Sequence, residues 1–181
     1  IRKNKFVACP FTGGIDSLYS ALKFIKEITH FFYIIGCDIN YEKSNQTWID
    51  FNINHIRYMI RKYFGNKPLI IIKSNLVINI HNILKEQQIN TEWTYLCNGF
   101  GLFSSVINLD KFYKIIIPGP GSGNGKYLKL SKHIVYNSFK DKGSTSFLKI
   151  IQSDNTRPEK IKYIYNYHPD IFNNIRICTN W

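Results

Sequence analysis

The side chains best suited to chemistry lie close together near the start of the chain: Thr12, Gly13, Gly14, Asp16 and Ser17. The two glycines have no Cβ, so backbone amides beside them can close around an anion. The hydroxyls of Thr12 and Ser17 add hydrogen-bond donors on both sides of the glycines. A carboxylate such as Asp16 is unexpected beside a phosphate unless it holds a magnesium ion or fixes the loop. The pattern therefore predicts a phosphate-binding loop.

A strand and a helix must position this loop. Residues 5–11 are mostly apolar and predict a short strand, and residues 16–28 have apolar side chains at helical spacing. A helix that begins near Asp16 directs its unpaired N–H groups and the positive end of its dipole toward the loop. Phosphate-binding loops occur in this order of strand, glycine turn and helix.

The alternation of strand and helix continues along the chain. Further strands are expected at residues 31–39, 69–73, 114–118 and 147–152, which with residues 5–11 make the five of the sheet, and residues 175–178 are a candidate for one more short strand. Helices are expected at residues 46–64, 93–109 and 156–167, with a helical or irregular segment at 77–88 and an irregular excursion at 126–146. This alternation predicts an α/β fold in one domain, residues 1–181, with right-handed crossovers. We expect three α/β/α layers around a parallel five-stranded sheet.

Ligands of parallel sheets bind outside the carboxyl ends of the strands. This rule selects four loops, at residues 12–17, 38–45, 73–76 and 118–126. Asp38 ends the second expected strand and faces the cleft by topology. The glycine-rich stretch from Gly119 to Gly125 lacks the spacing of a Walker A loop, and Tyr127 stands where that loop needs a serine or threonine. It is either a plain loop or a lid in which Lys126 reaches a phosphate.

The last expected helix has a clear start. Thr156 can cap it, Pro158 comes early in its first turn, and Glu159 follows three residues after the cap. Arg157 and Lys160 lie in the same region and could neutralise phosphates. The alternative, two cations on a solvated first turn, stays open because the helix dipole disfavours positive charge there.

Amino-acid composition and net charge restrict the kinds of ligand and partner that we expect. The chain has 181 residues, 24 Lys+Arg against 12 Asp+Glu, a formal net charge of +12 and 44% hydrophobic residues, which excludes a disordered tail. Lysine (19), isoleucine (30) and asparagine (19) are all abundant whereas arginine (5) is scarce, so the charge reflects a bias over the whole chain. It weakly favours an anionic ligand, and a nucleic-acid partner is possible but not favoured.

Other classes of protein are excluded by counting. No apolar run approaches the roughly 20 residues of a bilayer span, and no secretory leader opens the chain. Cys9, Cys37, Cys97 and Cys178 are widely separated without a C-x-x-C pair, which favours reduced thiols in a cytoplasmic protein. The chain begins with Ile1 rather than Met and enters the expected strand at residues 5–11 almost at once, so we expect it to continue beyond one or both ends.

The hexapeptide TGGIDS at residues 12–17 resembles the S-G-G-x-D-S signature of the PP-loop ATP pyrophosphatases, which are adenine nucleotide alpha-hydrolase-like proteins. That superfamily includes the GMP, NAD and asparagine synthetases, the tRNA lysidine and thiolation enzymes, and 7-cyano-7-deazaguanine synthase. Thr12 replaces the usual serine and keeps the hydroxyl. The resemblance implies binding of ATP–Mg²⁺, with Asp16 on the metal.

Further segments are similar to the 7-cyano-7-deazaguanine synthase branch: Trp93, Gly99 and Leu102, then residues 115–118, 157–161 and 175–178, and finally Trp181. In that branch a cysteine placed like Cys178 is followed by a C-x-x-C pair, and together they bind structural zinc. The sequence given contains no such pair, so either the pair lies beyond residue 181 or the zinc site is absent, and one cysteine alone cannot make a site.

The resemblance implies an AMP-forming ligase. A carboxylate or carbonyl oxygen of a small-molecule acceptor would attack the α-phosphorus of ATP, pyrophosphate would leave, and a nitrogen nucleophile would displace AMP. Asp16 and Ser17 are the expected catalytic residues, and we expect alanine at either position to abolish activity without unfolding the domain. The expected ATP contacts are Thr12, Gly13, Gly14, Asp16, Ser17, Asp38, Gly119, Lys126 and Lys160.

Two alternatives use the same loop. A PP-loop enzyme of the tRNA thiolation or lysidine type would employ the positive charge for RNA, although the sequence shows no C-x-x-C module or arginine-rich patch. A non-catalytic ATP-binding subunit of a complex is the other, and an oligomer or a partner subunit is compatible with all three.

Overall fold

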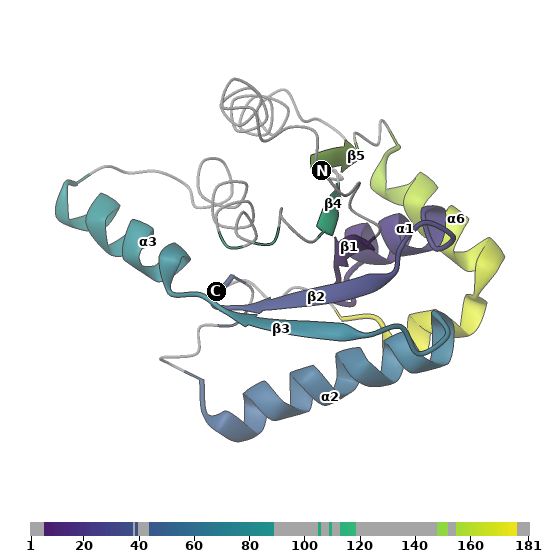
Figure 1. Cartoon of the computed structure of the whole chain (residues 1–181), viewed down its shortest axis with the longest axis horizontal. Coiled ribbons are helices and arrows are strands. Elements are labelled where there is room, and N and C mark those ends of the chain that lie inside the picture. Colours follow the sequence, from purple (N-terminus) through teal and green to yellow (C-terminus); the bar gives the residue numbers. More distant parts are fainter. Residues whose placement is uncertain are drawn as a thin grey trace.

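The computed structural model of the protein describes residues 6–37, 39, 44–88, 105, 109, 113–118, 148–151 and 155–176. It is a mixed α/β fold with a parallel sheet, as predicted (Figure 1). In chain order the elements are β1 (Phe6–Pro10), α1 (Ile15–Lys23), β2 (His30–Ile35), α2 (Gln46–Tyr63), β3 (Leu69–Lys73), α3 (Leu76–Glu86), β4 (Tyr113–Pro118), β5 (Leu148–Ile151), α6 (Arg157–Tyr167) and the 3-10 helix η2 (Pro169–Asn174).

The strands lie in the order β3-β2-β1-β4-β5, and each neighbouring pair is parallel. Strand β1 therefore lies inside the sheet, with β2 on one side and β4 on the other. Cys9 of β1 is in register with Phe31 of β2, which is in register with Leu69 of β3. The loop that follows β1 consequently leaves from the interior of the carboxyl edge.

One face of the sheet forms the main core. Side chains alternate along a strand, so Cys9, Phe31, Tyr33 and Ile35 point to the same face, and all four are buried. The buried residues that pack with them come from α1, α2, α6 and η2: Leu18, Tyr19, Ala21, Leu22, Ile49, Ile53, Ile56, Met59, Ile60, Tyr63, Ile164 and Ile171. Helix α2 runs along β2 and β3, and α6 lies against α1 (Figure 1).

The opposite face of the sheet is apolar as well. Ala8, Phe32 and Ile34 alternate with the residues of the main core, and their exposed fractions are 0%, 0% and 4%. A sheet buried on both faces reads as near-continuous apolar runs, and that is the pattern from which the strands were predicted.

Several element boundaries follow from local chemistry. Asn45 caps α2, because its side chain accepts a hydrogen bond from the backbone N–H of Trp48 at 2.8 Å. Gly65, with φ of 71°, stops the chain after α2, as predicted. Gly36, with φ of 103°, ends β2 at Ile35 rather than at the predicted residue 39.

Some other predicted boundaries differ from the structure, and some predicted segments lie outside the described residues. Helix α1 ends at Lys23 rather than at residue 28, and η2 was not predicted at all. The segment at 77–88 is helical, as α3. Ile175 and Arg176 lie outside any strand. The predicted excursion at 126–146, most of the predicted helix at 93–109, and residues 177–178 fall outside the described residues.

Helix α6 begins with a complete capping box. The hydroxyl of Thr156 accepts from the backbone N–H of Glu159, and the carboxylate of Glu159 accepts from the backbone N–H of Thr156 at 2.6 Å. The hydrogen bonds that this carboxylate accepts from the backbone N–H and from the hydroxyl of Thr156 lower the pKa of Glu159. The start of α6 is therefore fixed locally, and with it the position of Lys160 one turn later.

We expect Thr156→Ala to lower the free energy of unfolding by about 1 kcal/mol, because it removes the hydroxyl that accepts from the N–H of Glu159 and donates to the Glu159 carboxylate. Urea denaturation followed by circular dichroism measures the change. Thr47→Ala is the matched control, since Thr47 is exposed in the first turn of α2 and does not cap it. Equal losses in the two variants would contradict the role of the cap.

Among the residues that the structure describes, no helix is long and apolar enough to cross a membrane.

Candidate functional site

The glycine loop, residues 11–14, joins β1 to α1 and is folded around its own hydroxyls. The hydroxyl of Ser17 donates to the carbonyl oxygen of Gly14 at 2.9 Å and lies 3.3 Å from the hydroxyl of Thr12. The backbone N–H of Thr12 donates to Ser17 at 3.3 Å, and that of Gly14 donates to Thr12 at 3.4 Å. Several of these bonds are long, so a phosphate oxygen can replace them.

Helix α1 begins directly behind the loop without a side-chain cap. Gly14 is its N-cap residue, and it has no side chain to offer. The N–H groups of Ile15, Asp16 and Ser17 belong to the first turn, where no intrahelical acceptor exists. Within the described part of the chain they have no other acceptor either. The loop and the helix together thus present several amide donors and the positive end of a dipole.

The glycines are required for close approach. Gly13 has φ of +78°, and a Cβ built on it would lie 3.1 Å from the sulfur of Met59. A Cβ on Gly14 would lie at ordinary van der Waals distances, 3.5 Å from the hydroxyl oxygen of Thr12 and 3.7 Å from the carbonyl oxygen of Arg176. A larger residue at position 13 would strain the loop, and one at position 14 would add a side chain beside the Thr12 hydroxyl.

Lys160 of α6 reaches this site from the far end of the chain. Its Nζ lies 2.6 Å from Oδ1 of Asp16, with side-chain exposures of 1% for the lysine and 33% for the aspartate. The same nitrogen lies 5.6 Å from the centre of the Tyr19 ring. Lys160 had been predicted to contact ATP, and the structure brings it to the first turn of α1.

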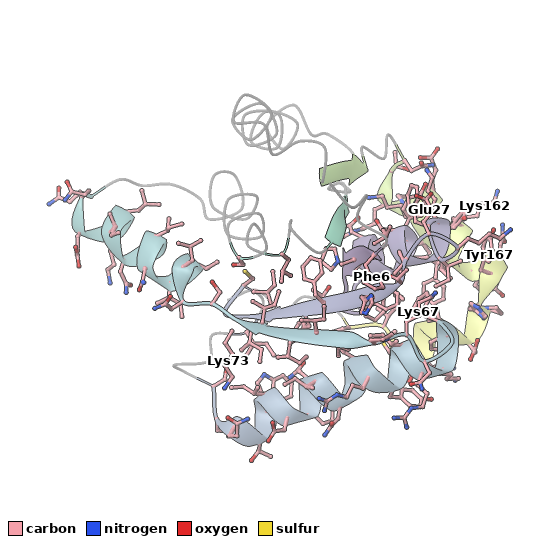
Figure 2. All side chains as sticks on the ribbon, in the orientation of Figure 1. Phe6, Glu27, Lys67, Lys73, Lys162 and Tyr167 are labelled. Carbon is pink, nitrogen blue, oxygen red and sulfur yellow. The ribbon has the colours of Figure 1, made fainter. Side chains whose placement is uncertain are left out.

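The neighbouring basic residues of α6 are placed differently. Arg157 is exposed at the start of the helix. Figure 2 shows Lys162 pointing outward from the same helix, together with Tyr167. The alternative of cations on a solvated first turn is therefore wrong for Lys160 and right for Arg157.

Arg176 also meets the glycine loop, and sequence reasoning missed it as a site residue. Its backbone N–H donates to the carbonyl oxygen of Gly13 at 3.1 Å, and its guanidinium donates to the hydroxyl of Tyr33 at 3.2 Å. The only sequence signal was its place in a motif that was interpreted as a strand. Nothing local to either segment indicates that residues 13 and 176 touch.

A second group of polar side chains lies at the carboxyl edge. The hydroxyl of Ser105 donates to that of Ser74, just after β3, at 3.0 Å, and lies 4.0 Å from the thiol of Cys37, just after β2. Cys9 is fully buried in β1, and burial raises the pKa of its thiol. Cys9 and Cys37 are both free thiols, as predicted.

Three predicted ATP contacts, Asp38, Gly119 and Lys126, fall outside the described residues. The other six lie together, namely Thr12, Gly13, Gly14, Asp16, Ser17 and Lys160. No group of three or more His, Cys, Asp or Glu side chains that could hold a metal ion occurs in the described part of the chain. The second oxygen of Asp16 has no described partner, and one carboxylate beside substrate phosphates is a common arrangement for Mg²⁺.

Comparisons with protein-family models, with curated proteins and with solved structures find no match to the chain.

Proposed function

We propose that the glycine loop binds the polyphosphate of ATP and that the protein cleaves ATP to AMP and pyrophosphate in order to activate an acceptor. The observation that carries this proposal is that two sets of amide donors lie next to each other. They are the amides of the glycine loop and those of the uncapped first turn of α1, in which Asp16 is paired with the buried Lys160. Adjacent amide donors at a helix N-terminus favour a compact, highly charged anion.

The chemistry follows from where negative charge develops. An acceptor carboxylate or carbonyl oxygen attacks the α-phosphorus, the bond from this phosphorus to the bridging oxygen breaks, and pyrophosphate leaves with the electron pair. The amides of Gly14, Ile15 and Asp16 and the hydroxyls of Thr12 and Ser17 stabilise the charge on pyrophosphate. Preorganised donors of this kind are the most effective form of electrostatic catalysis.

The acidic member of the site has a double role in this proposal. Asp16 would hold Mg²⁺ through its second oxygen, and its first oxygen accepts from Lys160 at 2.6 Å. A bound Mg²⁺ supplies charge neutralisation for the polyphosphate. Lys160 is fully buried and orients the Asp16 carboxylate, so the lysine serves the phosphates through the aspartate.

A nitrogen nucleophile then displaces AMP from the activated acceptor, as in the 7-cyano-7-deazaguanine synthases that the sequence resembles. This chemistry requires positioning of reactants rather than a nucleophile from the protein. The hydroxyls of Ser74 and Ser105 lie at the carboxyl edge, where the ligands of parallel sheets bind, and can orient either reactant.

We also infer the complete three-layer α/β/α arrangement. Its support is that Ala8 of β1 and Phe32 and Ile34 of β2 are buried on one face of the sheet, while α1, α2 and α6 share the core of the other face. Parallel sheets with two covered faces are typical of α/β nucleotide-binding proteins.

The test is to incubate the protein with ATP–Mg²⁺ and candidate acceptors and to measure AMP and pyrophosphate. We expect equal amounts of both products, and a rate lower by about 100-fold in Ser17→Ala, because one donor to the leaving group is removed. Ser20→Ala is the control, since its hydroxyl bonds within α1 to the carbonyl oxygen of Asp16. Release of ADP and phosphate would refute the proposal. Stimulation by tRNA would favour the tRNA-modifying alternative.

A further inference from the structure

The chain that follows α6 forms a strap, which we define as η2 (Pro169–Asn174) together with Ile175 and Arg176. It crosses the side of α2 and ends on the glycine loop. Its one fully buried residue, Ile171, belongs to the main core, so the strap is anchored in the fold and does not merely lie on its surface.

A row of polar contacts fixes the strap to α2. The carboxylate of Asp170 lies 3.0 Å from the ammonium of Lys62 and accepts from the hydroxyl of Tyr63 at 3.1 Å. The side-chain amide of Asn174 donates to the hydroxyl of Tyr63 at 3.0 Å, and the backbone carbonyl oxygen of Asn174 lies 2.9 Å from Nε2 of His55. Hydrogen bonds from Lys62 and Tyr63 hold the pKa of Asp170 below its usual range. These contacts span two turns of α2.

The last residue of the strap meets the loop through its backbone. The N–H of Arg176 donates to the carbonyl oxygen of Gly13 at 3.1 Å. A Cβ on Gly13 would lie 3.5 Å from Cβ of Arg176, and a Cβ on Gly14 would lie 3.7 Å from the carbonyl oxygen of Arg176. The strap therefore packs on both glycines.

This backbone hydrogen bond determines which way one peptide unit points. In a trans peptide the carbonyl oxygen of Gly13 and the N–H of Gly14 point in opposite directions. Because the strap holds the oxygen of Gly13, the N–H of Gly14 is turned away from the strap, toward the hydroxyl of Thr12 at 3.4 Å. If the peptide were flipped, a carbonyl oxygen would face the anion.

We propose that the strap sets the anion-binding conformation of the glycine loop, with Arg176 as the positioning residue. The inference rests on the proposed function of the loop as a phosphate site. Its peptide N–H holds Gly13, and its guanidinium, bonded to Tyr33, holds that peptide in place. The guanidinium and the peptide N–H that fix the glycine loop thus come from a residue more than 150 positions away in sequence.

Three variants separate the peptide from the side chain. Arg176→Pro removes the N–H, and Ile175, with φ of −64° and ψ of 134°, already has the conformation that a residue before proline prefers. Arg176→Ala keeps the N–H and removes the guanidinium, and Tyr33→Phe removes its hydroxyl partner. Calorimetric titration of the full chain with inorganic pyrophosphate and with ATP–Mg²⁺ measures binding.

We expect Arg176→Pro to bind both ligands about tenfold more weakly, the equivalent of one hydrogen bond. Arg176→Ala and Tyr33→Phe should stay within about threefold of the unaltered protein, because the N–H remains. Hydrogen exchange adds a second test, because in a strap with a purely structural role the exchange of the Arg176 amide would not depend on the ligand. In the unaltered protein, pyrophosphate should slow exchange of the Arg176 amide, because ligand and strap favour the same loop conformation.

The outcomes are distinct. If the unaltered protein binds neither pyrophosphate nor ATP, the proposed function fails and the strap inference fails with it. If it binds them and Arg176→Pro binds equally well, or if Arg176→Ala loses as much as Arg176→Pro, the strap inference alone is overturned. If Arg176→Pro does not fold, hydrogen exchange of the unaltered protein decides. Pyrophosphate that leaves the exchange of the Arg176 amide unchanged would then overturn the strap inference.

Discussion

Replacing Asp16 by asparagine is expected to lower the free energy of unfolding by about 3 kcal/mol, because it leaves the ammonium of Lys160 buried without its carboxylate. Lys160 is buried completely, whereas the side chain of Asp16 is 33% exposed. Removing the carboxylate therefore leaves a buried charge, whereas removing the lysine leaves a carboxylate that is partly exposed. The value lies at the low end for a buried pair because Lys160 also contacts the Tyr19 ring.

Lys160→Met should cost much less stability, within about 1 kcal/mol, because an apolar side chain of similar length fills the site and Asp16 can still reach water. Both variants should lose affinity for ATP–Mg²⁺. Urea denaturation and calorimetric titration measure the two effects separately. The double variant Asp16→Asn with Lys160→Met should be about as stable as Lys160→Met alone. A single Asp16→Asn variant as stable as the unaltered protein would contradict this account.

This expectation revises what the sequence suggested for Asp16. From the motif alone, an alanine at this position should remove activity and leave the fold intact. The ion pair with Lys160 makes Asp16 part of the contact between α1 and α6 as well, so a loss of activity at this position must be corrected for unfolding. Ser17→Ala does not carry this ambiguity, since no buried charge depends on the hydroxyl.

The second large effect is expected at Gly13. Gly13→Ala should lower the free energy of unfolding by about 2 kcal/mol, because φ is +78° and the new Cβ would lie 3.1 Å from the sulfur of Met59. Pyrophosphate binding should be lost with it, because the loop must shift to relieve the contact. Urea denaturation and pyrophosphate titration measure the two quantities.

Variants at two other glycines separate the effect of backbone strain from the effect of the added Cβ on stability and binding. Gly65 has φ of +71° with nothing within 4 Å of a Cβ, so Gly65→Ala measures backbone strain alone, about 1 kcal/mol, and should not affect binding. Gly14 has φ of −83°, so Gly14→Ala should leave stability almost unchanged and weaken binding by adding a side chain beside the Thr12 hydroxyl. If Gly14→Ala bound pyrophosphate normally, the loop would not be the anion site.

The elements that the sequence predicted correctly are those that interactions between neighbouring residues determine. The strand, glycine turn and helix around Gly13 were predicted because periodicity and two glycines suffice to define them. The start of α6 was predicted from the Thr156 cap for the same reason. Strand β2 was predicted too long, because a fully apolar run does not reveal that Gly36 adopts a positive φ.

Long-range contacts explain what the sequence could not provide. Lys160 was selected by its motif, but neither its burial nor its pairing with Asp16 appears in any local pattern, since 144 residues separate the two. Arg176 was assigned to a strand, and its hydrogen bond to Gly13 is visible only in three dimensions. The row of contacts between η2 and α2 has no periodicity from which it could have been inferred.

The pairing of Asp16 with Lys160 and of Gly13 with Arg176 has a consequence for synthesis on the ribosome. The loop-forming residues emerge early, but the groups that complete their surroundings emerge more than 140 residues later. At about 5–20 residues per second the nascent chain spends several seconds with an unpaired Asp16 and an unlocked glycine loop. A prematurely terminated product would carry the signature peptide without the partners that fix it. The proposed nucleotide binding would therefore not assist early folding, because the loop is complete only once nearly all of the described chain has been made.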